Sequence, residues 1–539
     1  MWAGRARRAA EGEPPVNLVT RRQGGSGLGF ARALLLCCVL SPGTLGAQSY
    51  EALQRAAVLV QEGRLEEADQ QAQLALSDPE TRAVACSVLG AIRLQQERLE
   101  EGAELLQEAI RLEPLLLGAH LSLAQVYTLQ GQGERALEVF RQVLELDPSN
   151  ATARMALAAS ETEKGNYQRS LELAQPVLAA FEQTPEGLVV LATDLLKTGD
   201  RASAARLAGE WTRLADVPQA WSVRFAQLFA DDGLVAEAID MLEHAERTTP
   251  PSYELAFALG GAHLLNGDPA RALEAYDLAL ILRPRSVLAL RQAAAVAERQ
   301  GELERSLSYW LRARKIERDD PEILLGFGRV CLKMDLLDDA EAALTRAAEL
   351  RPDEPAYQYT LAAAKVGKKQ HEEAQALLEA LVEKRPDDAQ LQYALGSVLY
   401  IRGHFEEAAA RLRESLRLQP EQLASRHYLA LVARDQGRDE EAIGGLEDVL
   451  RRYPDHAASH EALAGLLMKD QRYTEAEPHL RRAVALNPES MKANYQLGLL
   501  LARTGRKEES ARQLELAKTL REEDDAASKL QLRILDSDL

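Results

Sequence analysis

The stretch of sequence that decides the fold is AHLSLAQVYTLQGQGERALEVFRQVLELDP, residues 119–148. Apolar residues with helical spacing lie on both sides of Gly131. Before this glycine stand Leu123, Ala124 and Tyr127, after it stand Ala136, Phe140 and Val143, and the stretch ends at Pro148. Glycine favours the left-handed conformation that ends a helix, and proline cannot continue the helical hydrogen-bond ladder. The stretch therefore predicts two helices joined by a short turn.

The same unit recurs along the chain with a period of 34 residues. The glycine of the turn returns as Gly63, Gly131, Gly165, Gly199, Gly233, Gly267, Gly301, Gly403, Gly437 and Gly505. The final proline returns as Pro114, Pro148, Pro250, Pro284, Pro352, Pro386, Pro420, Pro454 and Pro488. A small residue follows each glycine slot by five positions, and no insertion breaks the register from about 49 to 522. We therefore expect about fourteen tandem units.

This pattern resembles the tetratricopeptide repeat (TPR), and the resemblance covers residues 48–521. It implies an all-α fold, a right-handed α-solenoid (superhelix) of stacked helix–turn–helix repeats. Because a terminal repeat needs a polar cap, residues 522–539 are expected to form a capping helix and an acidic tail. Two regions depart from the pattern, near 151–218 and 286–320. In the first, Pro176 falls inside a second helix and Trp211 stands in an unusual slot, so both regions are expected to be kinked or looser.

Residues 1–47 have a different composition, which is typical of a secretory signal peptide. Arg21, Arg22 and Arg32 precede the apolar run 33–40, and small residues follow at 46–47. This run is much shorter than the roughly 20 residues that a membrane-spanning helix needs. We expect cleavage near Ala47, export to the periplasm or the extracellular space, and no stable transmembrane segment afterwards. If the leader is not a signal peptide, the alternatives are a mitochondrial or a cytoplasmic location.

The charged residues and the cysteines are explained by structural roles in the repeat and do not indicate a functional site. A net charge of −19 with no cluster of basic residues argues against nucleic acid as a partner. The acidic pairs, such as Glu406-Glu407, fall in the first turn of the second helix in seven of the units, where they complement the helix dipole. Cys86 and Cys331 occupy apolar slots seven periods apart, so we expect core thiols and no disulfide between them.

Motifs of catalysis are absent from the sequence after residue 47. It contains no GxSxG, no phosphate-binding glycine loop and no HExxH. His456 and His460 have the i, i+4 spacing of a metal site, but no third ligand is evident. We therefore predict a protein that is not an enzyme, with no cofactor, no metal and no catalytic residue.

In the TPR family the first helices line the concave, ligand-binding face. The lysine and asparagine clamp for acidic C-terminal peptides is absent, since its positions hold residues such as Leu121 and Gln125. An asparagine ladder is absent too, since its position holds residues such as Ser122 and Ala258. Aromatic and basic residues instead mark residues 350–500 as a peptide-binding groove, with the candidates Tyr359, Tyr393, Tyr400, His427, Tyr428, Arg434, Lys469 and Tyr495. The alternative is that these tyrosines only seal the seams between repeats.

The sequence thus favours an exported, non-catalytic scaffold that binds proteins or peptides, as in envelope or secretion-machinery assembly. A regulatory or substrate-presenting subunit of an enzyme complex, with catalysis on a separate chain, is the alternative. An intracellular co-chaperone fits less well, because the clamp is missing and a leader is present.

Overall fold

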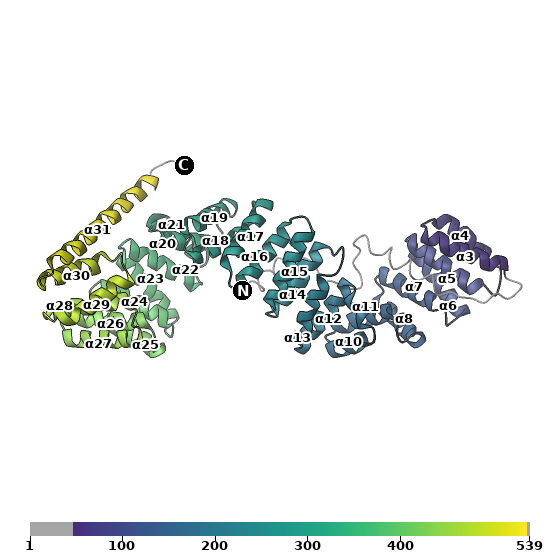
Figure 1. Ribbon diagram of the computed structural model, residues 1–539, viewed down its shortest axis with the longest axis horizontal. Coiled ribbons are helices and arrows are strands. Elements are labelled where there is room, and N and C mark those ends of the chain that lie inside the picture. Colours follow the sequence, from purple (N-terminus) through teal and green to yellow (C-terminus); the bar gives the residue numbers. More distant parts are fainter. Residues whose placement is uncertain (1–46, 536–539) are drawn as a thin grey trace. The chain divides into compact units, whose positions relative to one another are not determined.

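The computed structural model describes residues 47–535, with side chains described from 48 to 522. This part of the chain is helical throughout and contains no strand. Helices follow one another in pairs, and we call the first helix of each pair the A helix and the second the B helix. Figure 1 shows the two members of a pair lying side by side. The predicted leader lies outside the described residues, apart from Ala47 at the start of the first helix.

The first of two compact units ends at Arg283. Its A helices are α3 (Ala47–Gln61), α5 (Arg82–Gln95), α7 (Leu117–Leu129), α9 (Ala151–Glu163), α12 (Pro185–Thr198), α14 (Gln219–Asp231) and α16 (Tyr253–Leu265). Its B helices are α4 (Leu65–Leu74), α6 (Leu99–Leu112), α8 (Gly133–Leu146), α10 (Tyr167–Ala174), which continues as η2 (Gln175–Val177) and α11 (Leu178–Glu182), then α13 (Arg201–Trp211), α15 (Val235–Thr248) and α17 (Pro269–Leu282).

The second unit begins at Pro284. Its A helices are α18 (Val287–Gln300), α20 (Pro321–Lys333), α22 (Pro355–Gly367), α24 (Ala389–Ile401), α26 (Leu423–Asp435), α28 (Ala457–Lys469) and α30 (Met491–Arg503). Its B helices are α19 (Leu303–Ile316), α21 (Leu337–Leu350), α23 (His371–Lys384), α25 (Phe405–Leu418), α27 (Asp439–Arg452), α29 (Tyr473–Leu486) and α31 (Lys507–Leu535). Each unit therefore contributes seven pairs, which confirms the fourteen repeats expected from the sequence.

The turn between the A and the B helix is left-handed, as the glycine pattern predicted. All ten glycines of the turn have a positive φ, for example 74° at Gly131. Four repeats lack the glycine, and there Glu97, Asp335, Lys369 and Gln471 adopt φ between 57° and 60°. The turn between the A and the B helix thus has the same backbone conformation in every repeat. The residue type at the turn determines only how strained this conformation is.

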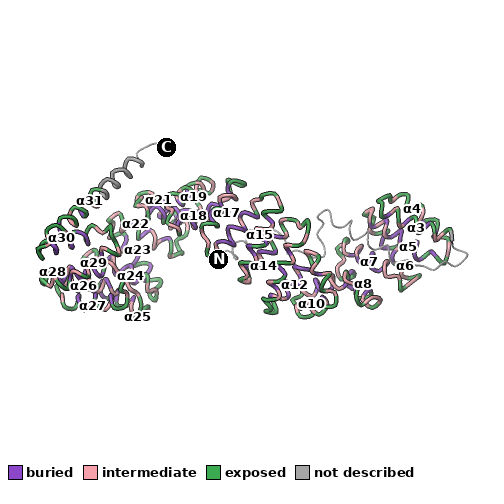
Figure 2. The backbone as a smooth tube through the Cα atoms, in the orientation of Figure 1, coloured by how far each residue is buried: buried purple, intermediate pink, exposed green. Residues whose placement is uncertain are grey.

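Helices within a pair approach closely because small residues lie at their crossing points. A Cβ atom added at Gly90 would lie 2.5 Å from Leu106 Cγ, and one added at Gly260 would lie 2.6 Å from the ring of Tyr276. Figure 2 shows the buried residues inside the helix pairs and the exposed ones at the turns and outer surfaces. Cys86 and Cys331 are both buried and free, which confirms their prediction as core thiols.

The irregularity predicted near Pro176 is confirmed. The prediction of a second irregular region near 286–320 is wrong. The B helix of the fourth pair stops at Ala174, continues as a 3-10 turn around Pro176, and resumes as α11. Phe181 then packs into the core, and Gly187 of α12 lies against its backbone. Trp211, in its unusual slot, stacks on Phe225 with a centroid distance of 4.1 Å. Residues 286–320, by contrast, form two unbroken 14-residue helices, α18 and α19.

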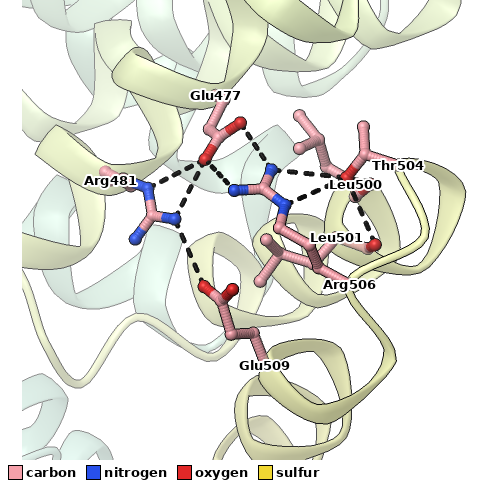
Figure 3. Close-up of polar contacts among 7 residues, drawn as sticks. All are labelled: Glu477, Arg481, Leu500, Leu501, Thr504, Arg506 and Glu509. Carbon is pink, nitrogen blue, oxygen red and sulfur yellow. Dashed lines mark hydrogen bonds and ion pairs between the residues drawn. The ribbon is translucent and has the colours of Figure 1, made fainter.

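The last pairs are linked by ion pairs around Glu477 (Figure 3). Arg506 Nη1, in the turn before α31, donates to Glu477 Oε1 of α29 at 2.6 Å. Arg481 Nε donates to the same oxygen at 3.0 Å, and Arg481 also reaches Glu509 of α31. The helix α31 continues without a break past residue 521 to Leu535, through much of the segment expected to be the cap. Residues 536–539 lie outside the described part of the chain.

Candidate functional site: an aromatic surface on the A helices

Three tyrosines on two neighbouring A helices contact one another and form what we call the tyrosine cluster: Tyr393, Tyr400 and Tyr428. The ring of Tyr428 on α26 lies 5.9 Å from that of Tyr393 and 5.4 Å from that of Tyr400, both on α24. Both pairs are edge-to-face, the geometry that the ring quadrupoles favour. The three side chains are only partly buried and pack against the core of the same repeats. They therefore seal a seam and also present ring surface to solvent.

The hydroxyl of Tyr400 is held by a charged pair. It donates to Asp435 Oδ2 at 2.6 Å and accepts from Arg434 Nη2 at 3.0 Å, while Arg434 Nε donates to Asp435 Oδ1 at 2.6 Å. Burial, and then the hydrogen bond to Asp435, raise the pKa of Tyr400 to about 12. The hydrogen bond to Asp435 likewise raises the pKa of Arg434. The ring of Tyr400 is therefore fixed in place, and the charge of Arg434 is largely neutralised.

Tyr359 and Tyr393 occupy the same slot in successive repeats. The hydroxyl of Tyr359 on α22 accepts from Gln390 Nε2 of α24 at 2.9 Å. Burial raises the pKa of Tyr393 to about 12, so this phenol stays neutral at physiological pH. Tyr359 is thus adjacent to the tyrosine cluster through Gln390, although it does not belong to it.

His427 is buried below the cluster rather than exposed on it. Its ring lies edge-on to that of Tyr428 at 5.9 Å, and its Nδ1 lies 2.8 Å from Ser459 Oγ of α28. The same hydroxyl lies 2.7 Å from Nδ1 of His456. Burial lowers the pKa of His427 to about 4, so the imidazole is neutral. We interpret His427 as a support for Tyr428 and as a link to the next repeat.

The two remaining candidates lie apart from the cluster. Lys469, at the end of α28, is exposed and its Nζ forms an ion pair with Asp439. Tyr495 on α30 is 50% exposed and has no partner among the described side chains. The structure therefore assembles Tyr393, Tyr400, Tyr428 and Arg434, brings Tyr359 beside them, and leaves Lys469 and Tyr495 as separate surface residues.

Basic side chains near this surface have acidic partners. Lys365 at the end of α22 pairs with Glu341 and Glu373, and Arg402 after α24 pairs with Glu372 at 3.1 Å. Arg434 beside the cluster is likewise paired, with Asp435, so each of these three cations has an acidic partner beside an aromatic surface. Such a surface suits apolar and aromatic side chains better than a strongly acidic peptide.

The two histidines with the spacing of a metal site are His456 and His460. His456 and His460 point to different partners, since His456 contacts Ser459 whereas His460 Nδ1 lies 2.8 Å from His479 Nδ1. The other ring nitrogen of His460 lies 2.9 Å from the carbonyl oxygen of Pro454. Within the described residues, no group of three or more His, Cys, Asp or Glu side chains is arranged to hold a metal ion.

Sequence reasoning missed the residues that position the tyrosines: Gln390, Asp435 and Ser459. The 34-residue period places some of these residues in equivalent positions of successive repeats. Arg434 follows Tyr400 by 34 residues, and Tyr393 follows Tyr359 by the same interval. Asp435 and Gln390 stand next to these slots, where polar residues also occur as ordinary solvent-exposed positions. Only the side-chain geometry distinguishes a polar residue that positions a tyrosine from one that is simply exposed to solvent.

Comparison with known protein families identifies the family of this chain. Two models, both described as tetratricopeptide repeat, match it: one at residues 88–151, 223–287, 402–457, 429–487 and 461–526, the other at 128–192, 297–364 and 337–398. These matches cover most of the described chain. The chain belongs to the tetratricopeptide-repeat family, whose members are typically protein-binding scaffolds rather than enzymes, and no enzymatic domain is found in it.

Solved structures are similar in fold at low sequence identity. A tetratricopeptide repeat protein from Parabacteroides merdae is 18% identical, with a TM-score of 0.41, over 46% of this chain and 98% of that one. Yeast Tom70 is 16% identical, with a TM-score of 0.36, over 91% of this chain and 99% of that one. YrrB, described as a TPR protein with an unusual peptide-binding site, is 19% identical, with a TM-score of 0.31, over 35% and 96%. No curated protein matches the sequence. Identities this low carry no information about partners.

The fold and the family thus define a tandem-repeat scaffold that binds protein partners. Among the residues that the structure describes, no helix combines the length and the apolar character needed to cross a membrane.

Proposed function

We propose that this scaffold binds an extended or helical peptide segment of a partner protein at the tyrosine cluster of the second unit. The observation that carries the proposal is the contact of Tyr428 with both Tyr393 and Tyr400, which joins two successive A helices into one partly exposed aromatic surface. Tyrosine is enriched among the residues that dominate binding energy at interfaces. Its rigid ring also loses little conformational entropy when a partner covers it.

The fixed orientation of Tyr400 supports the binding of an apolar anchor residue. Tyr400 is fixed by Arg434 and Asp435, so its ring orientation is set before a partner arrives. Preorganisation of this kind raises affinity, because less ordering occurs on binding. The neutralised cations around the cluster favour a segment with apolar side chains and a low net charge.

The test is a selection of peptides from a random displayed library on the full chain, followed by affinity measurements on purified variants. Tyr428→Ala and Tyr393→Ala are expected to weaken binding of the selected peptides tenfold or more, about 1.4 kcal/mol or more. Tyr167→Ala, a partly buried tyrosine on α10 of the first unit, is the matched control. Circular dichroism checks that helical content is retained. Loss of helical content without a selective loss of binding would mean that the tyrosines only seal the seam.

We also propose that the protein is exported, with its leader removed near Ala47. The basic residues, short apolar run and small residues of 1–47 support this location, whether periplasmic or extracellular. N-terminal sequencing of the protein isolated from its host is the decisive measurement. A mature end near Gln48 is expected, and an intact Met1 in a cytosolic fraction would contradict export.

A further inference from the structure

The repeat formed by α18 and α19 differs from the others at the end of its B helix. Arg314 stands in a slot that is apolar in most repeats. The corresponding residues elsewhere include Leu76, Ile110, Leu144, Leu178, Leu280, Val382, Leu416, Leu450 and Val484. In those repeats the slot carries a branched apolar side chain. Here it carries a guanidinium group on a flexible carbon stem.

The next departure lies four residues further along. Arg318 occupies the slot where nine repeats have the helix-ending proline. In the other repeats without proline, this slot is acidic, as at Glu80, Glu182 and Asp216. Arg318 is exposed and has no hydrogen bond or ion pair among the described residues. Two unusual arginines therefore stand one helical turn apart at one inter-repeat junction.

A pocket of about 330 Å³ lies at this junction, between α19 and α21. Its lining consists of Arg314, Arg318, Asp319, Leu324, Ala342, Ala343 and Arg346. Two of its guanidinium groups are positioned by neighbours. Arg346 of α21 donates to Asp319 Oδ1 at 2.9 Å and to Glu349 at 3.2 Å. The guanidinium carbon of Arg314 lies 5.0 Å from the ring centroid of Phe327, which is a cation–π contact.

We propose that this pocket binds a phosphate monoester. Three arginines and one aspartate line it. Arg346 is paired with Asp319 and Glu349, whereas Arg314 and Arg318 have no acidic partner among the described residues, and their two positive charges match the dianion of a monoester better than a single carboxylate. Arginine presents planar pairs of N–H donors that bind phosphate oxygens in a bidentate manner. Leu324, Ala342 and Ala343 give the pocket an apolar wall for the carbon group that carries the phosphate.

This site is separate from the tyrosine cluster. The pocket is built mainly from the B helices α19 and α21, whereas the tyrosines lie on the A helices α24 and α26. The site therefore supplies a second recognition element for a phosphorylated ligand, and it stands or falls independently of the peptide-binding proposal.

Calorimetric titration of the full chain with phenyl phosphate tests the proposal, at about 0.15 M salt, where charges are screened beyond about 8 Å. Saturable binding to the unsubstituted chain is expected, with a loss of roughly tenfold or more in Arg318→Ala, because a charge-assisted contact is removed. Arg314→Leu combined with Arg318→Pro restores the residues of the other repeats and is expected to keep the fold and abolish binding. Arg413→Ala, an exposed arginine on the B helix α25, is the matched control and should bind normally.

Benzoate and inorganic phosphate distinguish the chemistry of the ligand. Weaker binding of both than of phenyl phosphate supports a monoester site. Benzoate binding as tightly as phenyl phosphate would mean a carboxylate pocket, and inorganic phosphate binding as tightly would mean a site for the free ion. Either result overturns the proposal, as does a failure of the unsubstituted chain to bind or equal binding by Arg318→Ala. If the double variant does not fold, the single variants Arg318→Ala and Arg314→Leu decide the question.

Discussion

Thr162 of α9 donates a hydrogen bond to Asp194 of α12, with Oγ1 and Oδ1 2.8 Å apart, and this carboxylate is completely buried. Ser170 of α10 supplies a second hydroxyl. The same slot is apolar in nearly every other repeat, as at Val126 and Val330. Burial raises the pKa of Asp194 to about 6, and the two hydroxyl groups offset only part of this effect. One repeat therefore contains an acid where its neighbours have a core side chain.

Asp194 should make the stability of this region fall as pH rises. Because its folded pKa of about 6 exceeds the unfolded value near 3.9, the folded state binds the proton more tightly. The stabilisation is complete below pH about 4, is lost between about 4 and 6, and amounts to roughly 3 kcal/mol. Asp194→Asn should abolish that dependence and be more stable at pH 8. Urea unfolding at several pH values, with hydrogen exchange in α9 and α12, measures the difference, and parallel pH curves for the two proteins would contradict it.

Glycine substitutions in the left-handed turns that lack glycine are expected to raise the free energy of unfolding. Lys369 and Gln471 adopt φ of 59° and 60°, where a side chain costs about 1 kcal/mol. Lys369→Gly and Gln471→Gly should each raise the unfolding free energy by about 0.5–1 kcal/mol, since glycine adopts this conformation without strain. Gly403→Ala, at a turn with open space around the Cα, should lower it by about 1 kcal/mol. Denaturant midpoints check all three, and a loss of stability in both glycine variants would refute the strain argument.

Two other glycines of the first unit should respond in opposite directions to alanine. A Cβ at Gly187 would lie 2.3 Å from the carbonyl oxygen of Phe181, and backbone atoms cannot move aside cheaply. Gly187→Ala should therefore destabilise the protein by about 1–3 kcal/mol. Gly209 in α13 has nothing within 4 Å of the same added atom, so Gly209→Ala should stabilise it by about 0.5–1 kcal/mol through helix propensity. Thermal unfolding of both variants provides the comparison, and shifts of the same sign would disprove it.

The ion pairs of Glu477 should stabilise the last repeats only above acidic pH. The hydrogen bond from Arg506 and the contact with Arg481 hold the pKa of Glu477 below its usual value of 4.5. Glu477→Gln should cost about 1 kcal/mol at pH 7, and the difference should disappear as pH falls through the lowered pKa. Glu138→Gln, which breaks one exposed pair with Arg141 inside a single helix, should cost less. Hydrogen exchange in α29 and α30 reports the cost of Glu477→Gln, and exchange in α8 reports that of Glu138→Gln. Equal costs for both variants would argue against a network.

The repeat architecture could be predicted from sequence because each structural requirement leaves a residue type at a fixed interval. The left-handed turn selects glycine, the close helix crossing selects Ala136 and its counterparts, and the helix end selects proline. The prediction of a looser repeat near 286–320 is wrong, because a departure from the usual residues of the repeat does not by itself disrupt a helix. The structure keeps α19 regular and places Arg318 at its end.

The candidate site was only partly predictable. Tyr393, Tyr400 and Tyr428 could be placed on A helices by their slots, but their mutual contacts depend on how α24 and α26 pack. His427 stands in the same slot as Tyr393, although it is buried and bonded to Ser459. The position within the repeat therefore determines which face of the helix a side chain lies on. Packing against the neighbouring repeat then determines whether that side chain is exposed to solvent.

The constant register has a consequence for how the chain can change in length. The loop before α24, residues 385–388, and the loop before α26, residues 419–422, have equal length and each follows a B helix of equal length. Loss of residues 389–422 would leave α26 joined to α23 by a connection of the kind already present. A duplication or deletion of 34 residues would therefore reconnect the chain through an inter-repeat loop that already occurs in the molecule. An insertion of any other length would require a loop of a different length.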